Sequence, residues 1–247
     1  MLTLNAVMQN GILLGHVAGI PIRLRWSFLA LLLFVFVTMG GMAGVAAVLL
    51  TFASVLVHEL GHALVARRVG VRIGGIDLHF LGGAALMVDS PRKASDEIAL
   101  AAAGPIVSLA IAGLGFGLGA ATGVGIFASL GWINLVLGLF NLIPALPMDG
   151  GRILRAALAG RMSYRRATDV AVTVSRVFVV LFGIAAIAFG HLQLALLAGL
   201  LWFMGSAEKR MSWTTGYQDD VEVLPRGYDP YRRPSPPQQP RVYVVRW

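Results

Sequence analysis

The chain is 247 residues long and too apolar for a water-soluble domain of that length, because 57% of its residues are hydrophobic, only 13% are charged and the mean hydropathy is +0.77. It has no cysteine, which excludes disulfide frameworks and thiolate metal sites, so a transition metal would need imidazole and carboxylate ligands. The net charge of +8 is expected on cytoplasmic loops and against anionic lipid head groups rather than on nucleic acid.

Long stretches without a charged residue predict about six transmembrane helices. Residues 26–57 contain no Asp, Glu, Lys or Arg, and this run is too long for a single span, which needs about 20 residues. The runs 98–148 and 177–207 are also long enough for two helices each. The expected spans, divided at glycines, are 26–39 and 42–66, two within 98–148 around a turn near 119–125, and two short ones within 177–207 around Gly190 and His191.

The positive charges predict the orientation of this helical bundle. The three turns expected on the outer side carry no Lys or Arg, whereas the segments on the other side carry most of them. Since cytoplasmic loops are enriched in Lys and Arg, both termini are expected in the cytoplasm. The predicted fold class is a mainly α-helical polytopic membrane protein, with a transmembrane domain over residues 1–211 and a Pro-rich, basic, disordered tail over residues 212–247.

One short motif indicates a specific chemistry. The segment His58-Glu59-Leu60-Gly61-His62 falls near the end of the second expected span. A spacing of four puts the two imidazoles on one face of a helix, one turn apart, where they suit two ligands of a tetrahedral Zn²⁺. Glu59 then lies beside the metal and can accept a proton from the attacking water. Three ionisable groups inside a membrane helix are costly, which favours a functional site over a helix-packing role.

A zinc site of this kind needs a third protein ligand, and Asp149 is the best candidate. It follows Pro144 and Pro147, which break the fourth expected span at its cytoplasmic end, on the same membrane side as the motif. The Asp149 carboxylate could instead cap a helix that begins near Arg152, and His79 is a rival ligand. The expected site holds one zinc ion per chain, bound by His58, His62 and Asp149.

Four segments resemble the site-2 protease family of intramembrane zinc metalloproteases, in its compact prokaryotic form. They are Gly19-Ile20-Pro21-Ile22-Arg23, the motif from His58 to His62, Ala103-Gly104-Pro105, and an N-x-x-P-x-x-P-x-D-G pattern from Asn141 to Gly150. The last pattern is highly specific in combination with HExxH on a membrane helix. The resemblance implies the same ligands and base, and hydrolysis of a transmembrane protein substrate near the cytoplasmic side of a prokaryotic plasma membrane, with the active site open to the cytoplasm.

The resemblance also implies roles for three further residues. Residues 71–88 alternate apolar residues around Leu81-Gly82-Gly83, which looks like the family's small membrane-associated sheet. An edge strand at Gly82 and Gly83 would hold an unwound substrate by strand addition, and a plain cytoplasmic hairpin is the alternative. The side-chain amide of Asn141 would bond the substrate backbone or the developing oxyanion, with a helix-packing hydrogen bond as the alternative.

Two other functions remain open from the sequence. A non-catalytic zinc-binding membrane protein would keep the ligands but would have no need of Glu59. A metal-ion transporter would also place His and Asp in the membrane, but transporters more often show internal repeats, and this sequence has no convincing one. A membrane protease that uses Glu as its third ligand is excluded, because no Glu lies between Glu97 and Glu208.

Overall fold

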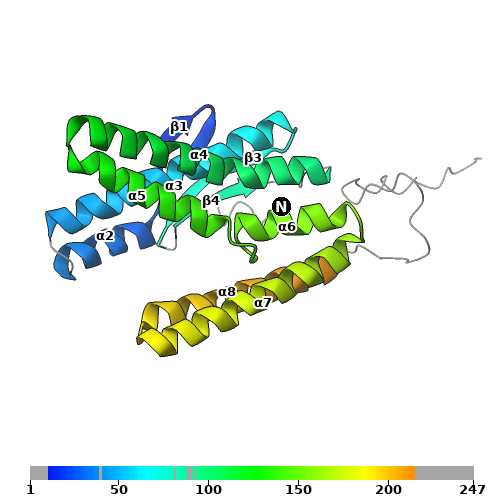
Figure 1. Cartoon of the computed structure of the whole chain (residues 1–247). Coiled ribbons are helices and arrows are strands. Elements are labelled where there is room, and N and C mark those ends of the chain that lie inside the picture. The colour runs from blue at the N-terminus through cyan, green and yellow to red at the C-terminus, as the bar shows by residue number, and fades with distance from the viewer. Residues whose placement is uncertain (1–10, 39–40, 81, 88–90, 92, 215–247) are drawn as a thin grey trace, which may run out of the picture.

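The computed structural model describes residues 11–38, 41–80, 82–87, 91 and 93–214, which form seven helices and one four-stranded sheet. The long helices run side by side, and the sheet lies against them (Figure 1). In chain order the elements are β1 (Gly11–Val17), β2 (Ile20–Arg25), α2 (Trp26–Thr38), α3 (Met42–Arg68), β3 (Ile73–His79), β4 (Gly82–Met87), α4 (Ala94–Thr122), α5 (Gly125–Asn141), α6 (Asp149–Ala159), α7 (Tyr164–Phe189) and α8 (Leu192–Thr214).

The sheet combines two hairpins that are far apart in the sequence. Its strand order is β1-β2-β3-β4, with antiparallel pairing inside each hairpin and parallel pairing between β2 and β3, where Ile22 lies opposite Ile76. Parallel strands need a long crossover connection, which here is the helix pair α2 and α3. Ile22, Ile76 and Leu78 are buried and pack with Phe52 and Ala63 of α3. One face of the sheet is thereby fixed against α3.

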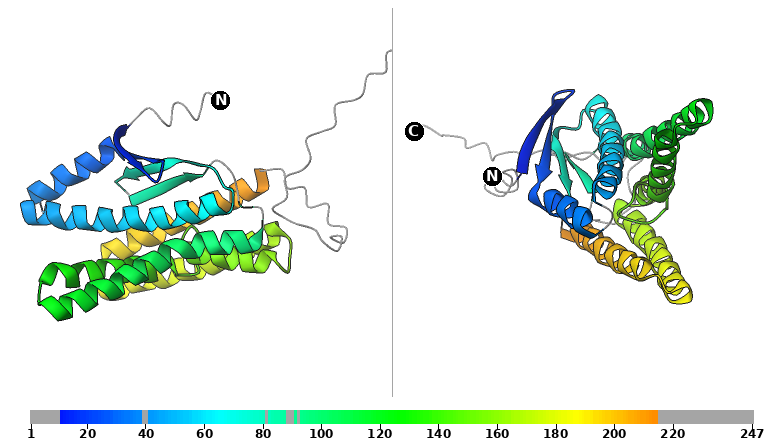
Figure 2. Two further views of the ribbon diagram at one scale, coloured as in Figure 1. Left: turned by 90° about the horizontal axis from the view of Figure 1, so that it is seen from above. Right: turned by 90° about the vertical axis from the view of Figure 1, so that its left-hand side faces the viewer.

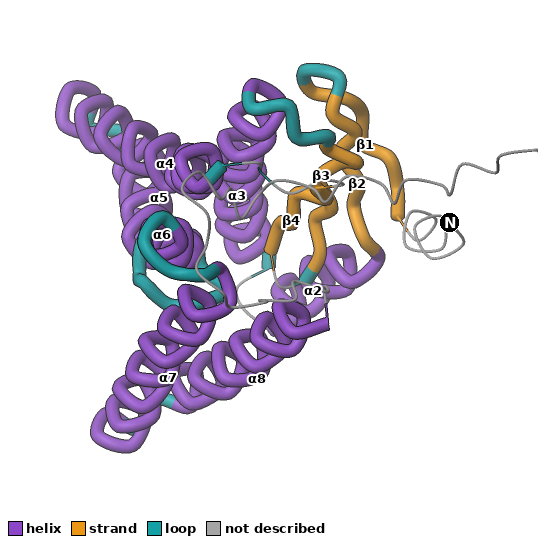
Figure 3. The backbone as a smooth tube through the Cα atoms, turned by 90° about the vertical axis from the view of Figure 1, so that its right-hand side faces the viewer, coloured by secondary structure: helices purple, strands orange, loops and turns teal. Residues whose placement is uncertain are grey.

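α3 is the central helix of the bundle. It lies between the sheet on one side and the α4–α5 hairpin on the other (Figure 3). Gly61 favours the close approach of α3 to α4, because a side-chain carbon there would lie only 3.1 Å from the Ala103 carbonyl oxygen. Gly115 of α4 likewise faces Gly131 of α5, with 2.7 Å between an added carbon and the Gly131 nitrogen. Small residues let these backbones approach closely, which is how helices pack inside a bilayer.

The remaining helices, α6, α7 and α8, form a separate group beside the helices described above. In the end-on view the α4–α5 and α7–α8 hairpins diverge (Figure 2, right), and α6 packs against both α4 and α7. Three helix junctions lie at the same end of the bundle, which is on the left in Figure 1. They are the junctions of α2 with α3, of α4 with α5 and of α7 with α8. This arrangement places all three expected outer turns on one side.

Several expectations from the sequence can be compared with this fold. The breaks within the two long apolar runs are confirmed, since α4 ends at Thr122 and α7 ends at Phe189. The expectation of strands only after the second helix was incomplete, because β1 and β2 precede α2 and contribute half of the sheet. The expected tail over 212–247 lies outside the described residues from residue 215 onward, and α8 continues to Thr214.

By length and composition, three described helices can each cross a membrane. These are α3, α4 and α7, whereas the apolar stretches of α2, α5 and α8 are shorter. α2 has 13 residues and α5 has 17, and a perpendicular span needs about 20. The structure therefore establishes a mainly helical membrane fold with three full-length candidate spans among the described residues.

Replacing Ile76 with alanine should lower the free energy of unfolding by about 2–5 kcal/mol, because this side chain is fully buried between the sheet and α3. The matched control is Ile12→Ala on β1, where the side chain is 41% exposed and the expected change is less than about 0.5 kcal/mol. Thermal unfolding in detergent measures both variants. Equal losses at the two positions would contradict the packing of the sheet on α3.

Candidate metal centre

The two histidines of the motif lie on one face of α3, as their spacing predicts. His58 and His62 are each 3% exposed, and their rings meet edge to face with 4.9 Å between centroids. Both rings form hydrogen bonds with α4. This placement follows from the helix itself, because residues four apart stand one above the other on the same side.

Asp149 reaches these rings because the chain leaves its helical path between α5 and α6. α5 ends at Asn141 and α6 begins at Asp149, so the intervening segment with its two prolines is not part of either helix. Side-chain carbons at Gly150 and Gly151 would overlap the backbone of that segment, so only glycine permits this tight return. The expected helix therefore begins at Asp149 rather than near Arg152, and Asp149 makes no capping hydrogen bond.

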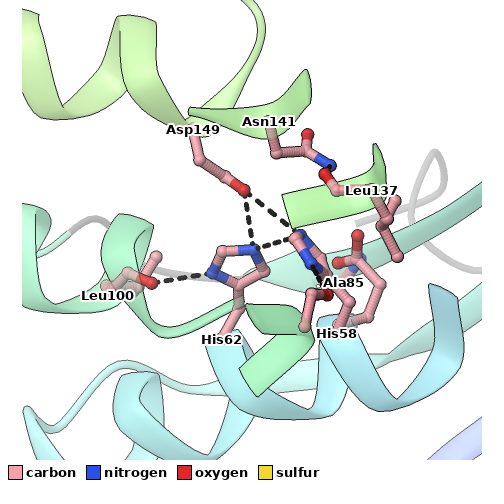
Figure 4. Close-up of polar contacts among 9 residues, drawn as sticks. His58, His62, Ala85, Leu100, Leu137, Asn141 and Asp149 are labelled. Carbon is pink, nitrogen blue, oxygen red and sulfur yellow. Dashed lines mark hydrogen bonds and ion pairs between the residues drawn. The ribbon is translucent and has the colours of Figure 1, made fainter. Parts of the chain in front are cut away.

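The three side chains converge on a single point (Figure 4). Asp149 Oδ2 lies 3.2 Å from His58 Nε2 and 3.1 Å from His62 Nε2, and the two Nε2 atoms are 3.2 Å apart. A tetrahedral zinc ion with ligands at about 2.0 Å separates any two of its ligand atoms by about 3.3 Å. The triangle of ligand atoms therefore has the dimensions of one face of such a site.

α4 sets the orientation of both imidazoles. His62 Nδ1 lies 2.7 Å from the Leu100 carbonyl oxygen, and His58 Nδ1 lies 2.9 Å from Ser108 Oγ. A carbonyl oxygen can only accept, so Nδ1 of His62 carries the hydrogen and the neutral ring presents the lone pair of Nε2 to the centre. Metal-binding histidines are typically held in this way by their second nitrogen.

The electrostatics of Asp149 also favour a cation at the centre. Burial alone would raise the pKa of this carboxyl, but its hydrogen bonds and electrostatic interactions with His58 and His62 lower it to about 2. The carboxylate is therefore ionised at neutral pH and needs positive charge beside it. A divalent cation at the centre can supply that charge.

Gly104 makes room for the centre on α4. A side-chain carbon at this position would overlap Nε2 of both imidazoles. The residue belongs to Ala103-Gly104-Pro105, one of the four segments that resemble the site-2 protease family. The structure supplies the physical reason, which is that the backbone of α4 itself forms one wall of the centre.

Glu59 lies between the centre and the sheet. It is half-buried, and its Oε2 accepts a hydrogen bond of 3.2 Å from the Ala85 amide of β4. An added carbon at Gly83 would lie 3.0 Å from Glu59 Cγ, so the start of β4 runs close past this side chain. The carboxyl is thus held beside the histidines by a strand rather than by another helix.

The other predicted residues take different places. Asn141 is the last residue of α5, and its Nδ2 donates to the Leu137 carbonyl oxygen at 3.0 Å, beside the centre (Figure 4). Gly82 and Gly83 open β4. His79 ends β3 and lines a shallow depression with Arg25 and Phe80, and it does not belong to the metal-ligating group found among the described residues.

Several groups around the centre were missed from the sequence. The Leu100 carbonyl and the Ser108 hydroxyl orient the rings, and a buried ion pair between Glu97 and Arg155 joins α4 to α6. A backbone carbonyl leaves no signal in a sequence, and a serine in an apolar helix is common. Glu97 directly precedes the charge-free run 98–148, which was the available signal.

Comparison with known proteins connects this geometry to a protein family. The sequence profile of peptidase family M50 matches residues 46–128 and 120–182. A zinc metalloprotease of Methanocaldococcus jannaschii is 34% identical over 216 residues, which cover 83% of this chain and 62% of the relative. The putative zinc metalloprotease Rip3 of Mycobacterium tuberculosis is 37% identical over 175 residues, which cover 61% of this chain and 44% of the relative. The matches thus span less than two thirds of either relative.

A solved structure gives the same result. The site-2 protease from Methanocaldococcus jannaschii matches with a TM-score of 0.64 and 32% sequence identity, over 81% of this chain and 95% of that chain. Because the match extends over most of both chains, it shows that the two chains share their overall fold.

Gly104→Ala should weaken zinc binding by at least about tenfold, because the new methyl group would displace the imidazoles from the centre. Gly113→Ala in the same helix is the matched control, since no described atom beyond the neighbouring backbone of α4 lies within 4 Å of a carbon added there. Competition with a chromophoric chelator measures the zinc affinity of each purified variant. Wild-type affinity in Gly104→Ala would show that the rings do not occupy the positions described.

Proposed function

Because the chain belongs to peptidase family M50, the site-2 proteases, we propose that it is an intramembrane zinc metalloprotease that hydrolyses a peptide bond in or near the transmembrane segment of a membrane protein. The observation that carries this proposal is the buried convergence of His58, His62 and Asp149, with Glu59 beside it. A structural zinc site would need neither a neighbouring carboxylate base nor an open coordination position.

In this proposal His58, His62 and Asp149 are the three protein ligands of one zinc ion, and the fourth position is left for water or substrate. Their spacing and the hydrogen bonds to Ser108 and Leu100 support the assignment. Bound there, zinc supplies a Lewis acid that lowers the pKa of water and polarises the scissile carbonyl.

Glu59 is the proposed general base and acid. Its carboxylate follows the first ligand on α3 and is held next to the centre by the Ala85 amide. It takes a proton from the attacking water and returns that proton to the leaving amine, so no covalent intermediate with the chain is required. Such proton transfers contribute about 10²–10⁴-fold to a reaction rate.

The proposed substrate is a transmembrane protein that unwinds locally before it is cleaved. A helix uses its backbone groups internally, so the scissile carbonyl becomes accessible only after those hydrogen bonds open. β4 runs past Glu59 and offers an extended edge beginning at Gly82 and Gly83, which suits strand addition by the unwound segment. Asn141, beside Asp149, is proposed to bond the substrate backbone or the developing oxyanion.

We also propose that six helices cross a prokaryotic plasma membrane, with the termini and the opening of the active site on the cytoplasmic side. The positions of the three helix junctions at one end of the bundle support this orientation, as does the absence of Lys and Arg from those junctions. Shorter spans such as α2 are accommodated by local thinning of the bilayer.

Glu59→Gln should lower the rate of cleavage by about 10²–10⁴-fold while zinc remains bound, because the amide cannot accept a proton and no ligand is altered. The measurement is co-expression with a panel of single-span membrane proteins that carry helix-weakening residues near the cytoplasmic side, followed by immunoblotting for a shorter product. Zinc content is determined on the same preparations.

Asp169→Asn is the matched control, because this partly exposed acid on α7 pairs with Lys209 and lies outside the proposed site. It should leave both cleavage and zinc content unchanged. Cleavage that persists at the wild-type rate in Glu59→Gln would rule out the proposed role of Glu59 and the protease assignment with it.

The proposed topology predicts which positions are accessible from outside the cell. Because the chain lacks cysteine, single-cysteine variants need no altered background. Thr122→Cys, at the end of α4, should react with a membrane-impermeant maleimide in intact cells, whereas Ser163→Cys, at the start of α7, should react only after the cells are permeabilised. The reverse pattern would invert the orientation, and labelling of both from outside would eliminate the six-span arrangement.

A further inference from the structure

A buried ion pair near the metal centre has no part in the chemistry described above. Arg155 Nη2 donates to Glu97 Oε1 at 2.6 Å, and the side chains of Arg155 and Glu97 are 7% and 3% exposed. Burying two charges costs several kcal/mol of desolvation for each ion, and apolar replacements are often at least as stable. Stability alone is therefore a weak reason for such a pair.

The pair joins the two parts of the chain that carry the centre. Glu97 lies one turn before Leu100 on α4, and the Leu100 carbonyl orients His62. Arg155 lies six residues after Asp149 on α6, and both residues are buried. The start of α4 thus contacts both His62 of α3 and the helix α6, which carries Asp149.

The position of Arg155 is itself well defined. Its guanidinium carbon lies 5.1 Å from the centre of the Tyr164 ring, at the start of α7. A planar guanidinium that is both stacked and hydrogen-bonded loses little freedom when it binds a carboxylate, so it fixes geometry better than an ammonium group does. The ion pair can therefore transmit the position of α4 to α6.

We propose that Glu97 and Arg155 are positioning residues that set the distance between Asp149 and the two imidazoles. This inference rests on the proposed metal site. α6 is only 11 residues long, and it packs between α4 and α7. Without the ion pair, α6 can shift relative to α4, and the Asp149 carboxylate then leaves the tetrahedral position while the histidines stay in place.

A simpler role for Glu97 is to complement the positive end of the α4 dipole. Asp96 lies in the same first turn of α4 and would serve that role equally well. Asp96→Asn therefore removes the same charge from the same helix end without breaking the contact with Arg155. It is the matched control for Glu97→Gln.

The test measures zinc affinity in purified full-length protein by chelator competition, together with the absorption spectrum of the Co²⁺-substituted form and the melting temperature of the metal-free form. Glu97→Gln and Arg155→Met should each weaken zinc binding by about 10–100-fold, the range seen when groups that orient metal ligands are removed. Their Co²⁺ spectra should lose intensity as the site departs from tetrahedral geometry. Arg155→Lys should recover only part of the affinity, because the ammonium group keeps the charge but not the planar geometry of the guanidinium, and Asp96→Asn should match the wild type.

Two outcomes would overturn the inference. Zinc affinity and Co²⁺ spectra equal to the wild type in Glu97→Gln and Arg155→Met, even with a lower melting temperature, would mean that the pair only stabilises the fold. An equal loss in Asp96→Asn would assign the effect to the helix dipole. If Arg155→Met does not fold, Glu97→Asp shortens the contact by one methylene group and decides the question with the same readouts.

Failure of this inference differs from failure of the proposed function. A wild-type chain that binds no zinc, or whose cleavage survives Glu59→Gln, contradicts the proposed function. A wild-type chain that binds one zinc ion, with unchanged affinity in Glu97→Gln, contradicts only the role of the ion pair.

Discussion

The structure depends on one constraint, which is that three electron-rich atoms from two helices must be held about 3.2 Å apart inside an apolar bundle. Without positive charge between them these atoms repel one another, and in a medium of low dielectric the repulsion is strong. The surrounding elements must therefore be rigid. α3 supplies two of the atoms through its periodicity, α4 orients them, and the segment between α5 and α6 delivers the third.

Local regularities made much of this site predictable from the sequence. The proximity of His58 and His62 follows from helix geometry alone, which brings residues four apart together. Asp149 could be predicted because two prolines end α5 and the alternating topology returns the chain to the same membrane side. Glycines likewise predicted the junction between α4 and α5, because glycine adopts the backbone conformations of a turn at little steric cost.

What escaped prediction depends on contacts between distant segments. The parallel pairing of β2 with β3 joins Ile22 to Ile76 across two helices, and no local pattern specifies it. The hydrogen bond from His62 is accepted by a backbone carbonyl, and every residue has such a group, so the sequence cannot indicate which one serves as the acceptor. The partner of Glu97 lies on α6, and only the packing of α6 against α4 brings the two charges together. The six membrane crossings stay a prediction, because α2 and α5 are shorter than a standard span.

The segment between α5 and α6 explains how an irregular backbone can exist inside the bundle. A backbone without regular structure is tolerated at membrane depth only where its polar groups find partners. Here the Leu146 amide donates to Ser175 Oγ at 2.7 Å, and the Met148 amide donates to the Ala145 carbonyl at 2.9 Å. Leu146 and Ala145 are fully buried. The segment is therefore fixed to α7, which holds one end of α6 in place.

α6 is consequently held at both ends by different means. At its start, the hydrogen-bonded segment and the close packing of Gly150 fix the backbone at Asp149. Farther along, the contact of Arg155 with Glu97 fixes the rotation of the helix about its own axis. A short helix held at one point alone can still turn, and a turn of α6 would carry the Asp149 oxygen away from the imidazoles. Two separated contacts remove that freedom, which is why a costly buried ion pair is useful where apolar packing would be more stabilising.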